Sequence, residues 1–344
     1  MDKAHMIVER ARELGYDSCG IIPIGEVGGY ADRLTERIER SPADAENYKG
    51  FYRFARPQEA FPWAKSIIVC ARRYGKYRIP PHLQGVIAKY YLVDGRRDEN
   101  SPDYKASVAF EGYLESLGLR LASERSFGLT ALRWAAHKAG IGLIRRNNFF
   151  YTKSGSWVHL EAWLADEEME LRAQSDLKPC PPNCDKCVKS CPTGSLKAPY
   201  TMSRSACVSA LTTWDGNDFP SGPFARQVGG WIYGCDACQD ACPHNAGKWT
   251  QDEEFPFLDE LAGAISPEKI LDMDYDFLLT KMQPKFFYIR PDRLWKWKLN
   301  ALNAMFNNYD PGYESAVRRA CEDADERVRN AALFIREKKG KATP

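Results

Sequence analysis

The chain has 344 residues, 44% hydrophobic and 27% charged, which is typical of a globular protein with room for two or three domains. The formal net charge of +2, from 48 Lys and Arg against 46 Asp and Glu, does not by itself indicate a nucleic-acid partner. No apolar run reaches the length of a membrane span, and the charged N-terminal sequence lacks the apolar core of a signal peptide. We therefore expect no membrane partner, a cytoplasmic location and reduced thiols.

The first half of the chain alternates between helical and strand patterns. In chain order, we expect a helix over 4–14, strands over 18–24 and 66–71, and helices over 104–122 and 131–139. Gly140 follows the last of these where a helix C-terminal stop is typical. This alternation predicts an N-terminal α/β domain over 1–175 within an α+β protein.

Eight of the eleven cysteines lie in one stretch with the spacing of iron–sulfur ligands. The bacterial two-cluster ferredoxin pattern is C-x2-C-x2-C-x3-C-P, whose last Cys binds the other cluster. The chain has two such halves, each ending in Cys-Pro, with Cys207 between them. Exchanging the last Cys of each half predicts two 4Fe-4S clusters, one held by Cys180, Cys184, Cys187 and Cys242, the other by Cys191, Cys207, Cys235 and Cys238.

Two features depart from the ferredoxin spacing, and other uses of the cysteines stay open. The gap from Cys180 to Cys184 has one extra residue, and a long insert separates Cys207 from Cys235. Two zinc sites are the main alternative, because C-x2-C pairs also suit tetrahedral zinc. A disulfide framework is disfavoured by the expected reducing compartment. Three isolated cysteines receive no role: Cys19, Cys70 and Cys321.

The remaining sequence predicts two further domains. Residues 176–250 are rich in Cys, Pro and Gly, as expected for a ferredoxin-like domain organised by its clusters. Residues 251–344 become helical again, with patterns over 295–306 and 316–338 that resemble one HEAT-like repeat unit. Because a single repeat unit needs neighbours, we expect this pair to pack on the ferredoxin-like domain.

Local basic clusters occur at 72–78 and at Arg145-Arg146. A phosphate-bearing ligand or an RNA could use them, but a solvated surface is the favoured interpretation. A tRNA partner therefore stays open without support from the overall charge. A zinc-stabilised nucleic-acid-binding protein is a third interpretation, but the sequence lacks the interleaved aromatic and basic residues of a stacking platform.

With their flanking residues, the cysteine motifs resemble those of the cobalamin-dependent epoxyqueuosine reductases and, more distantly, the reductive dehalogenases. The similarity includes 191–200 with 207–212, the segment 233–245, and, in the N-terminal half, 14–17, 139–142 and 155–157. It implies an N-terminal corrinoid-binding domain above the ferredoxin module, with one cluster passing electrons to cobalt. By this resemblance, the corrinoid-binding candidates are Gly140, Gly142, Gly155, Ser156, Trp157, Ala198, Pro199, Tyr200 and Ser209.

The chain departs from the family pattern where a proton donor is expected. The family places an acidic residue before the helix that ends in Ala-Gly, whereas this chain has Ser126 at the corresponding point and Glu124 two residues earlier. Around Cys207 the usual charged neighbours are replaced by Ser203 and Ala206, and Arg145-Arg146 stands where a Gly-Lys pair is common. The donor candidates are Glu124, after a small loop shift, and Tyr151, because reductive dehalogenases use a tyrosine.

Two functional hypotheses follow from the resemblance. The first is a cobalamin- and iron–sulfur-dependent oxidoreductase that removes an oxygen or halogen from a small molecule or a modified nucleoside. It would receive electrons from a low-potential donor such as ferredoxin or flavodoxin. The second is an electron-transfer or corrinoid-handling protein without substrate chemistry of its own, which the missing acid favours.

Overall fold

The computed structural model describes residues 2–214 and 218–339. Its N-terminal half is built on a four-stranded sheet of order β1-β2-β6-β3. The strands are β1 (Ser18–Pro23), β2 (Ser66–Arg73), β3 (Leu121–Ser123) and β6 (Val158–Ala165), and all three pairings are antiparallel. This half therefore has the expected mixture of helices and strands, with antiparallel strand pairing.

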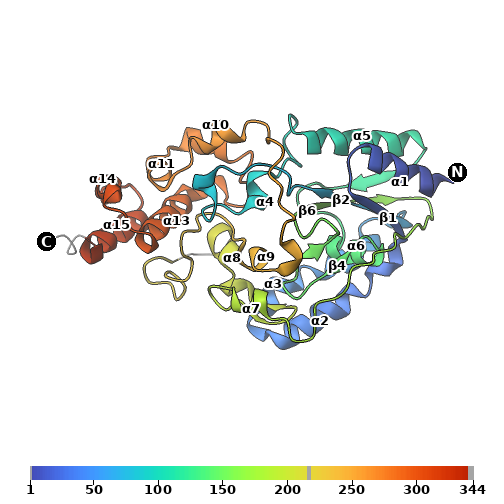
Figure 1. The fold of residues 1–344 in the computed structure, drawn as a ribbon, viewed down its shortest axis with the longest axis horizontal. Coiled ribbons are helices and arrows are strands. Elements are labelled where there is room, and N and C mark those ends of the chain that lie inside the picture. Colours follow the sequence, from blue (N-terminus) through green and yellow to red (C-terminus); the bar gives the residue numbers. More distant parts are fainter. Residues whose placement is uncertain (1, 215–217, 340–344) are drawn as a thin grey trace.

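Helices cover both faces of this sheet (Figure 1). Helices α1 (Lys3–Glu13) and α5 (Pro102–Ser116) pack on one face, where Ile7 and Phe110 meet Ile21 and Trp163. Helix α6 (Leu132–Lys138) packs on the other face, through Ala135 and Ala136. Helices α2 (Tyr30–Arg40), α3 (Ala45–Lys49) and α4 (Lys89–Leu92) complete this half. Strands β1, β2 and β6 are largely buried on both faces, and their side chains are mostly apolar, whereas the short edge strand β3 is only partly buried.

The cysteine-rich stretch forms a compact cluster region from short elements. These are α7 (Lys186–Lys189), β7 (Leu196–Ala198), β8 (Thr201–Met202), α8 (Val208–Thr213) and α9 (Ala237–Asp240). Helices α7 and α9 follow corresponding positions of the two cysteine motifs and pack against each other. In Figure 1 this region lies between the sheet and the C-terminal helices.

The C-terminal residues form short helices around one long buried helix, α13 (Leu294–Asn307). The others are α10 (Leu258–Ala262), α11 (Pro267–Leu271), α12 (Tyr275–Phe277), α14 (Glu314–Ala320) and α15 (Glu326–Lys339). The pattern over 316–338 thus gives two helices. Asn300 of α13 donates hydrogen bonds to the carbonyls of Thr212 and Ile232, both at 2.9 Å, so the predicted packing on the cluster region is confirmed.

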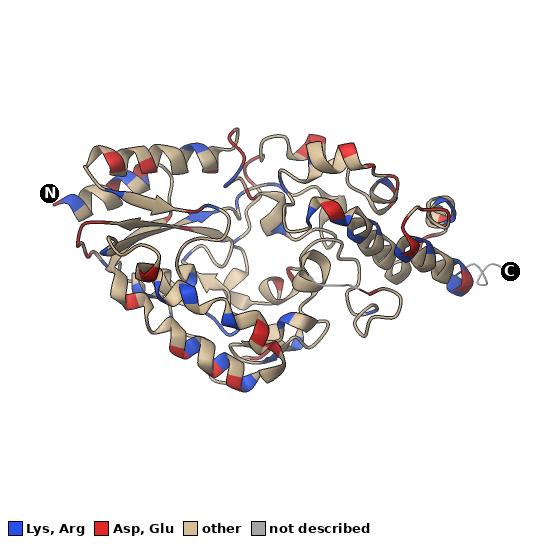
Figure 2. Ribbon diagram, turned by 180° about the vertical axis from the view of Figure 1, so that it is seen from behind, with Lys and Arg blue, Asp and Glu red and all other residues tan. Residues whose placement is uncertain are grey.

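The largest hydrophobic core joins segments far apart in sequence. Tyr74 and Leu92 from the first half share it with Tyr233, and Trp297 of α13 stacks on Tyr233 at 4.9 Å between ring centroids. Charged residues of both signs lie along the outer helices, whereas most of α13 carries none (Figure 2). No helix of the described residues is both long enough and apolar enough to cross a membrane.

Candidate functional site

The first group of thiols lies around a small cavity of the cluster region. Cys180, Cys184 and Cys187 line it together with Cys242, which belongs to the second motif. Burial is the main cause that raises the pKa of Cys187. The neighbouring thiols raise this pKa further, and Cys242 contributes more than Cys180 or Cys184. The fold therefore brings together the four residues that the exchange of the last cysteines assigns to one cluster.

The other four thiols form a second group. Cys207 lies close to Cys191, and both lie close to Cys235 and Cys238. Burial, followed by the charge of Cys235, raises the pKa of Cys238, so binding a cluster here must displace protons. Among residues 2–214 and 218–339, no three His, Cys, Asp or Glu side chains converge as ligands of a single metal ion.

A hairpin from the sheet half reaches the first thiol group. Its strands are β4 (Leu143–Ile144) and β5 (Phe150–Tyr151), and its tip carries Arg145, Arg146 and Asn147. Arg145 donates to Cys180 Sγ at 3.7 Å, and Arg146 donates to the carbonyl of Cys184 at 2.7 Å. The basic pair of the sequence is therefore part of the cluster site.

A larger cavity, here called the central cavity, lies between the sheet half and the second thiol group. Its volume is about 430 Å³, within the range of small-molecule sites. Cys235, Asp236 and Ser209 form one part of its wall, and the remainder is largely aromatic, including Tyr74, Tyr90, Tyr91, Phe127, Trp134 and Tyr288. A ligand in this cavity would lie directly against the second cluster.

A second cavity, here called the lateral cavity, adjoins the central one and has a volume of about 440 Å³. Helix α2 contributes Arg33, Arg37 and Arg40, and the cluster region contributes Tyr200. The two cavities share five lining residues, Tyr30, Arg37, Trp134, Ile144 and Asn148. A ligand too large for either cavity alone could therefore extend across both.

Cationic groups dominate the charged side chains at these cavities. Arg96 lies in the central wall and donates to Asp94 Oδ1 and Oδ2 at 2.9 and 2.8 Å and to the Tyr90 hydroxyl at 2.6 Å. Arg37 and Arg133 instead donate to Asn148.

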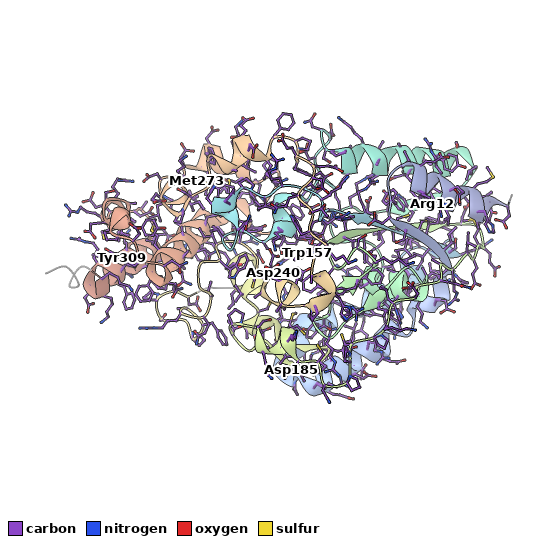
Figure 3. All side chains as sticks on the ribbon, in the orientation of Figure 1. Arg12, Trp157, Asp185, Asp240, Met273 and Tyr309 are labelled. Atoms are coloured by element: carbon purple, nitrogen blue, oxygen red, sulfur yellow. The ribbon has the colours of Figure 1, made fainter. Side chains whose placement is uncertain are left out.

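Helix α4 links the central cavity to the cluster region. Lys89 Nζ lies 4.6 Å from the ring centroid of Trp157 and forms an ion pair with Asp240 at 2.5 Å. Figure 3 shows Trp157 and Asp240 close together near the middle of the molecule, whereas Asp185 lies at its edge. Burial raises the pKa of Asp236 to about 7, and the Lys89 charge and its backbone N–H act in the opposite direction.

Comparison with known proteins gives this geometry a family context. A protein-family model described as "4Fe-4S double cluster binding domain" matches residues 180–245. An epoxyqueuosine reductase from Leadbetterella byssophila is 27% identical over 259 residues, covering 71% of this chain and 80% of its own. One from Prochlorococcus marinus is 27% identical over 325 residues, covering 87% and 96%. The chain is similar to epoxyqueuosine reductases over most of its length.

Solved structures share the fold of this epoxyqueuosine reductase-like chain. An epoxyqueuosine reductase in complex with an epoxyqueuosine-modified tRNA-Tyr stem loop aligns with a TM-score of 0.78 at 23% identity, over 96% of this chain and 88% of that one. The enzyme from Streptococcus thermophilus aligns with a TM-score of 0.77 at 21% identity, over 100% and 92%. The matched domain supports two 4Fe-4S clusters in place of the zinc alternative.

Only some of the residues that sequence analysis proposed for corrinoid binding line the two cavities. Ser156 and Ser209 line the central cavity, and Tyr200 lines the lateral cavity. The other six candidates are not among the described residues that line either cavity: Gly140, Gly142, Gly155, Trp157, Ala198 and Pro199. Their assignment to a corrinoid stays a prediction.

Two of these glycines have a clear structural use in the epoxyqueuosine reductase-like fold. Gly140 has φ +73°, and a Cβ there would lie 2.0 Å from the carbonyl oxygen of Ala173. A Cβ on Gly142 would lie 2.2 Å from the carbonyl oxygen of Tyr151. Both positions require glycine for close backbone packing, whichever ligand the cavities hold.

Neither proton-donor candidate is among the described residues that line either cavity. Burial alone would raise the pKa of Glu124, but backbone N–H groups of Phe127, Ser126 and Gly128 hold it below its usual range. Tyr151 is buried beside Cys242, and its hydroxyl accepts a hydrogen bond from Asn147 at 2.9 Å. Glu124 thus acts as a loop cap and Tyr151 as part of the first cluster's surroundings, while their catalytic roles stay predictions.

Sequence analysis missed several residues of the central wall. Tyr90, Arg96 and Tyr288 meet there from positions almost 200 residues apart in the sequence, and Asp94 lies behind Arg96 as its ion-pair partner. One local signal was available, since an Asp and an Arg two residues apart can form an ion pair when a turn brings them together. Nothing local indicated that Tyr288 would join them.

Proposed function

We propose that this chain is a cobalamin- and iron–sulfur-dependent reductase that removes an oxygen or a halogen from a substrate bound in the central cavity. The relatives' names point to a modified nucleoside as the substrate class. The observation that carries the proposal is the presence of Cys235, a second-cluster ligand, in the wall of this cavity. Electrons on that cluster would need no further protein carrier to reach a bound ligand.

The wall shared by the two cavities supports a corrinoid as the bound cofactor. The shared wall at Tyr30, Arg37, Trp134 and Asn148 offers aromatic surface and hydrogen-bond donors where the two cavities meet. Such groups suit a broad macrocycle with amide and phosphate substituents. When bound, the corrinoid would supply a low-potential metal able to reduce carbon–oxygen or carbon–halogen bonds.

The central cavity also offers an acid of its own. The Tyr90 oxygen accepts a hydrogen bond from Arg96. Burial raises the pKa of Tyr90 well above its usual range, and the Arg96 charge acts in the opposite direction, so the group carries its proton as a phenol. Tyr90 therefore could give its hydroxyl proton to the leaving oxygen or halide while Arg96 holds the resulting charge. Removal of a hydroxyl in this way consumes two electrons from an external low-potential donor and two protons, and releases water.

The first test is anaerobic reconstitution of the full chain with iron, sulfide and cobalamin, followed by desalting, metal counts and spectra before and after dithionite. We expect about eight iron atoms per chain and a retained corrinoid band that changes on reduction. An epoxyqueuosine-containing tRNA stem loop is the first substrate probe, followed by halogenated and epoxide small molecules. Iron without retained corrinoid would overturn the proposal.

A second candidate function rests on Glu124. Because its carboxylate caps three backbone N–H groups, the 124–130 loop directs no free acid into the cavity. An electron-transfer or corrinoid-handling protein needs no such acid. Retained corrinoid and reducible clusters without turnover of any probe would favour this second function.

A further inference from the structure

A departure from ferredoxin spacing and a departure from the epoxyqueuosine reductase pattern meet at one place in the structure. The loop from Cys180 to Cys184 has one residue more than the bacterial two-cluster pattern. The hairpin tip at 145–147 lies against this loop. Arg146 donates to the carbonyls of Pro182 and Cys184 at 2.5 and 2.7 Å, so it ties the longer loop to the sheet half.

Arg145 is a buried cation whose partner is a sulfur. Its exposed fraction is 2%, its Nη1 donates to Cys180 Sγ at 3.7 Å, and its guanidinium lies 5.2 Å from the Tyr151 ring centroid. Its Nε has no hydrogen-bond partner, and no carboxylate of the described residues pairs with it. A buried charge without a counter-ion is strongly unfavourable.

The groups around the first thiol site add to this positive charge. The same small cavity is lined by Arg146, Lys186 and His244, and no Asp or Glu of the described residues lines it. A 4Fe-4S cluster with four thiolates is an anion, and reduction adds one negative charge to it. The cluster is thus the group at this site that supplies a negative charge to balance the positive charge of Arg145.

We propose that Arg145 is the counter-ion of the first cluster and raises that cluster's reduction potential. A fixed cation and a hydrogen bond to a ligand sulfur both favour the more negative, reduced form. The step is a transfer of one electron from a low-potential donor to the oxidised cluster, with no proton taken up. Arg145 stays protonated in both states and acts only through the cluster, so it is a positioning residue.

The experiment compares R145Q with R145K in the reconstituted full chain. Each cluster's midpoint potential is measured by electron paramagnetic resonance at controlled potentials. We expect R145Q to lower one cluster's potential by about 59 mV, a tenfold change in the ratio of reduced to oxidised cluster, and R145K to restore most of it. The other cluster should not change.

The matched control is K189Q, which also removes one positive charge near the first cluster. Lys189 is largely exposed and already pairs with Asp185 at 2.9 Å, so solvent screens its charge. Equal potentials in R145Q and the wild type, or an equal shift in K189Q, would overturn the proposal. If R145Q loses the first cluster while R145K keeps it, the counter-ion role is supported. Loss in both would assign Arg145 a purely structural role and overturn the proposal.

This test does not depend on the proposed enzyme function. The potentials are measured with dithionite as the electron source and need neither a corrinoid nor a substrate. A protein that retains no cobalamin can therefore still show the Arg145 effect. Conversely, a working reductase with unchanged potentials in R145Q would retain its proposed function and lose only this inference.

Discussion

Arg96 and Arg145 are both almost fully buried, with exposed fractions of 5% and 2%, but they are neutralised in different ways. Arg96 has its counter-ion two residues away in the chain, where Asp94 receives two of its hydrogen bonds. Within the part of the chain that the structure describes, Arg145 has no carboxylate partner and donates a hydrogen bond to a cysteine sulfur. The first pair is complete in the polypeptide alone, whereas the second is complete only when a cluster is present. Burial of a charge can thus indicate a ligand site when no protein group of opposite charge accompanies it.

The two thiol groups differ in a parallel way. The first is reached by side chains of a hairpin from the sheet half and is partly exposed. The second adjoins the central cavity through Cys235, and backbone N–H groups of Ala210 and Ser209 hydrogen-bond to Cys207. The first group thus meets the sheet half through charged side chains, whereas the second meets the cavity in which we propose that a ligand binds.

The largest effect is expected from C242S. Although Cys242 belongs to the second motif, its loss should abolish the first cluster, because it lines that site with Cys180, Cys184 and Cys187. Iron should fall from about eight to about four atoms per chain, as measured by metal analysis after anaerobic reconstitution. C321S, in which the changed residue lies at the end of α14, is the control and should retain the full iron content. Full iron in C242S would contradict the exchanged assignment.

The next largest effect is expected from breaking the buried ion pair of Asp94 and Arg96. D94N leaves Arg96 buried without its carboxylate, which should lower the free energy of unfolding by about 3–5 kcal/mol. Urea unfolding followed by circular dichroism measures this change. E99Q removes a carboxylate from an exposed position five residues away and should have little effect. A loss below about 1 kcal/mol in D94N would show that Arg96 finds another counter-ion.

The pH dependence of this pair has a definite sign. Burial would raise the pKa of Asp94, but the Arg96 charge and hydrogen bonds dominate and hold it well below the ordinary value of 3.8. A carboxyl with a lowered folded-state pKa stabilises the fold above pH 3.8 and loses this contribution as the pH falls further. The difference in unfolding free energy between wild type and D94N should therefore shrink below about pH 4. A constant difference from pH 7 to pH 3 would assign it to packing.

The sequence predicted what depends on local spacing. The cysteine exchange, the helix at 131–139 and its glycine stop follow from patterns within a few turns of chain. The helical pattern assigned to 104–122 ended too late, because β3 begins at Leu121 and pairs with β6. Strand β6 itself was missed, although Val158 to Ala162 alternate between apolar and polar side chains.

The sites depend on contacts that no local pattern contains. The sequence alone favoured a solvated surface for Arg145-Arg146, yet the hairpin places Arg145 beside Cys180. Tyr90 and Tyr288 share a cavity wall only because the C-terminal segment packs against the first half. Residue type and spacing therefore identified the clusters, but tertiary packing determines which charges surround them.

The smallest effect is expected from R145M, measured in the wild type and in C242S. This comparison tests whether Arg145 is neutralised by the cluster and not by the polypeptide. With the first cluster present, R145M removes its counter-ion and should lower the unfolding free energy by about 1–2 kcal/mol. In C242S the same change removes a buried cation without a partner, so it should be neutral or stabilising, since apolar groups often replace buried charges favourably. The measurement is anaerobic urea unfolding of the four proteins, treated as a double-mutant cycle. Equal losses in both backgrounds would mean that Arg145 stabilises the hairpin tip through packing alone, because only an interaction with the cluster can change sign when the cluster is gone.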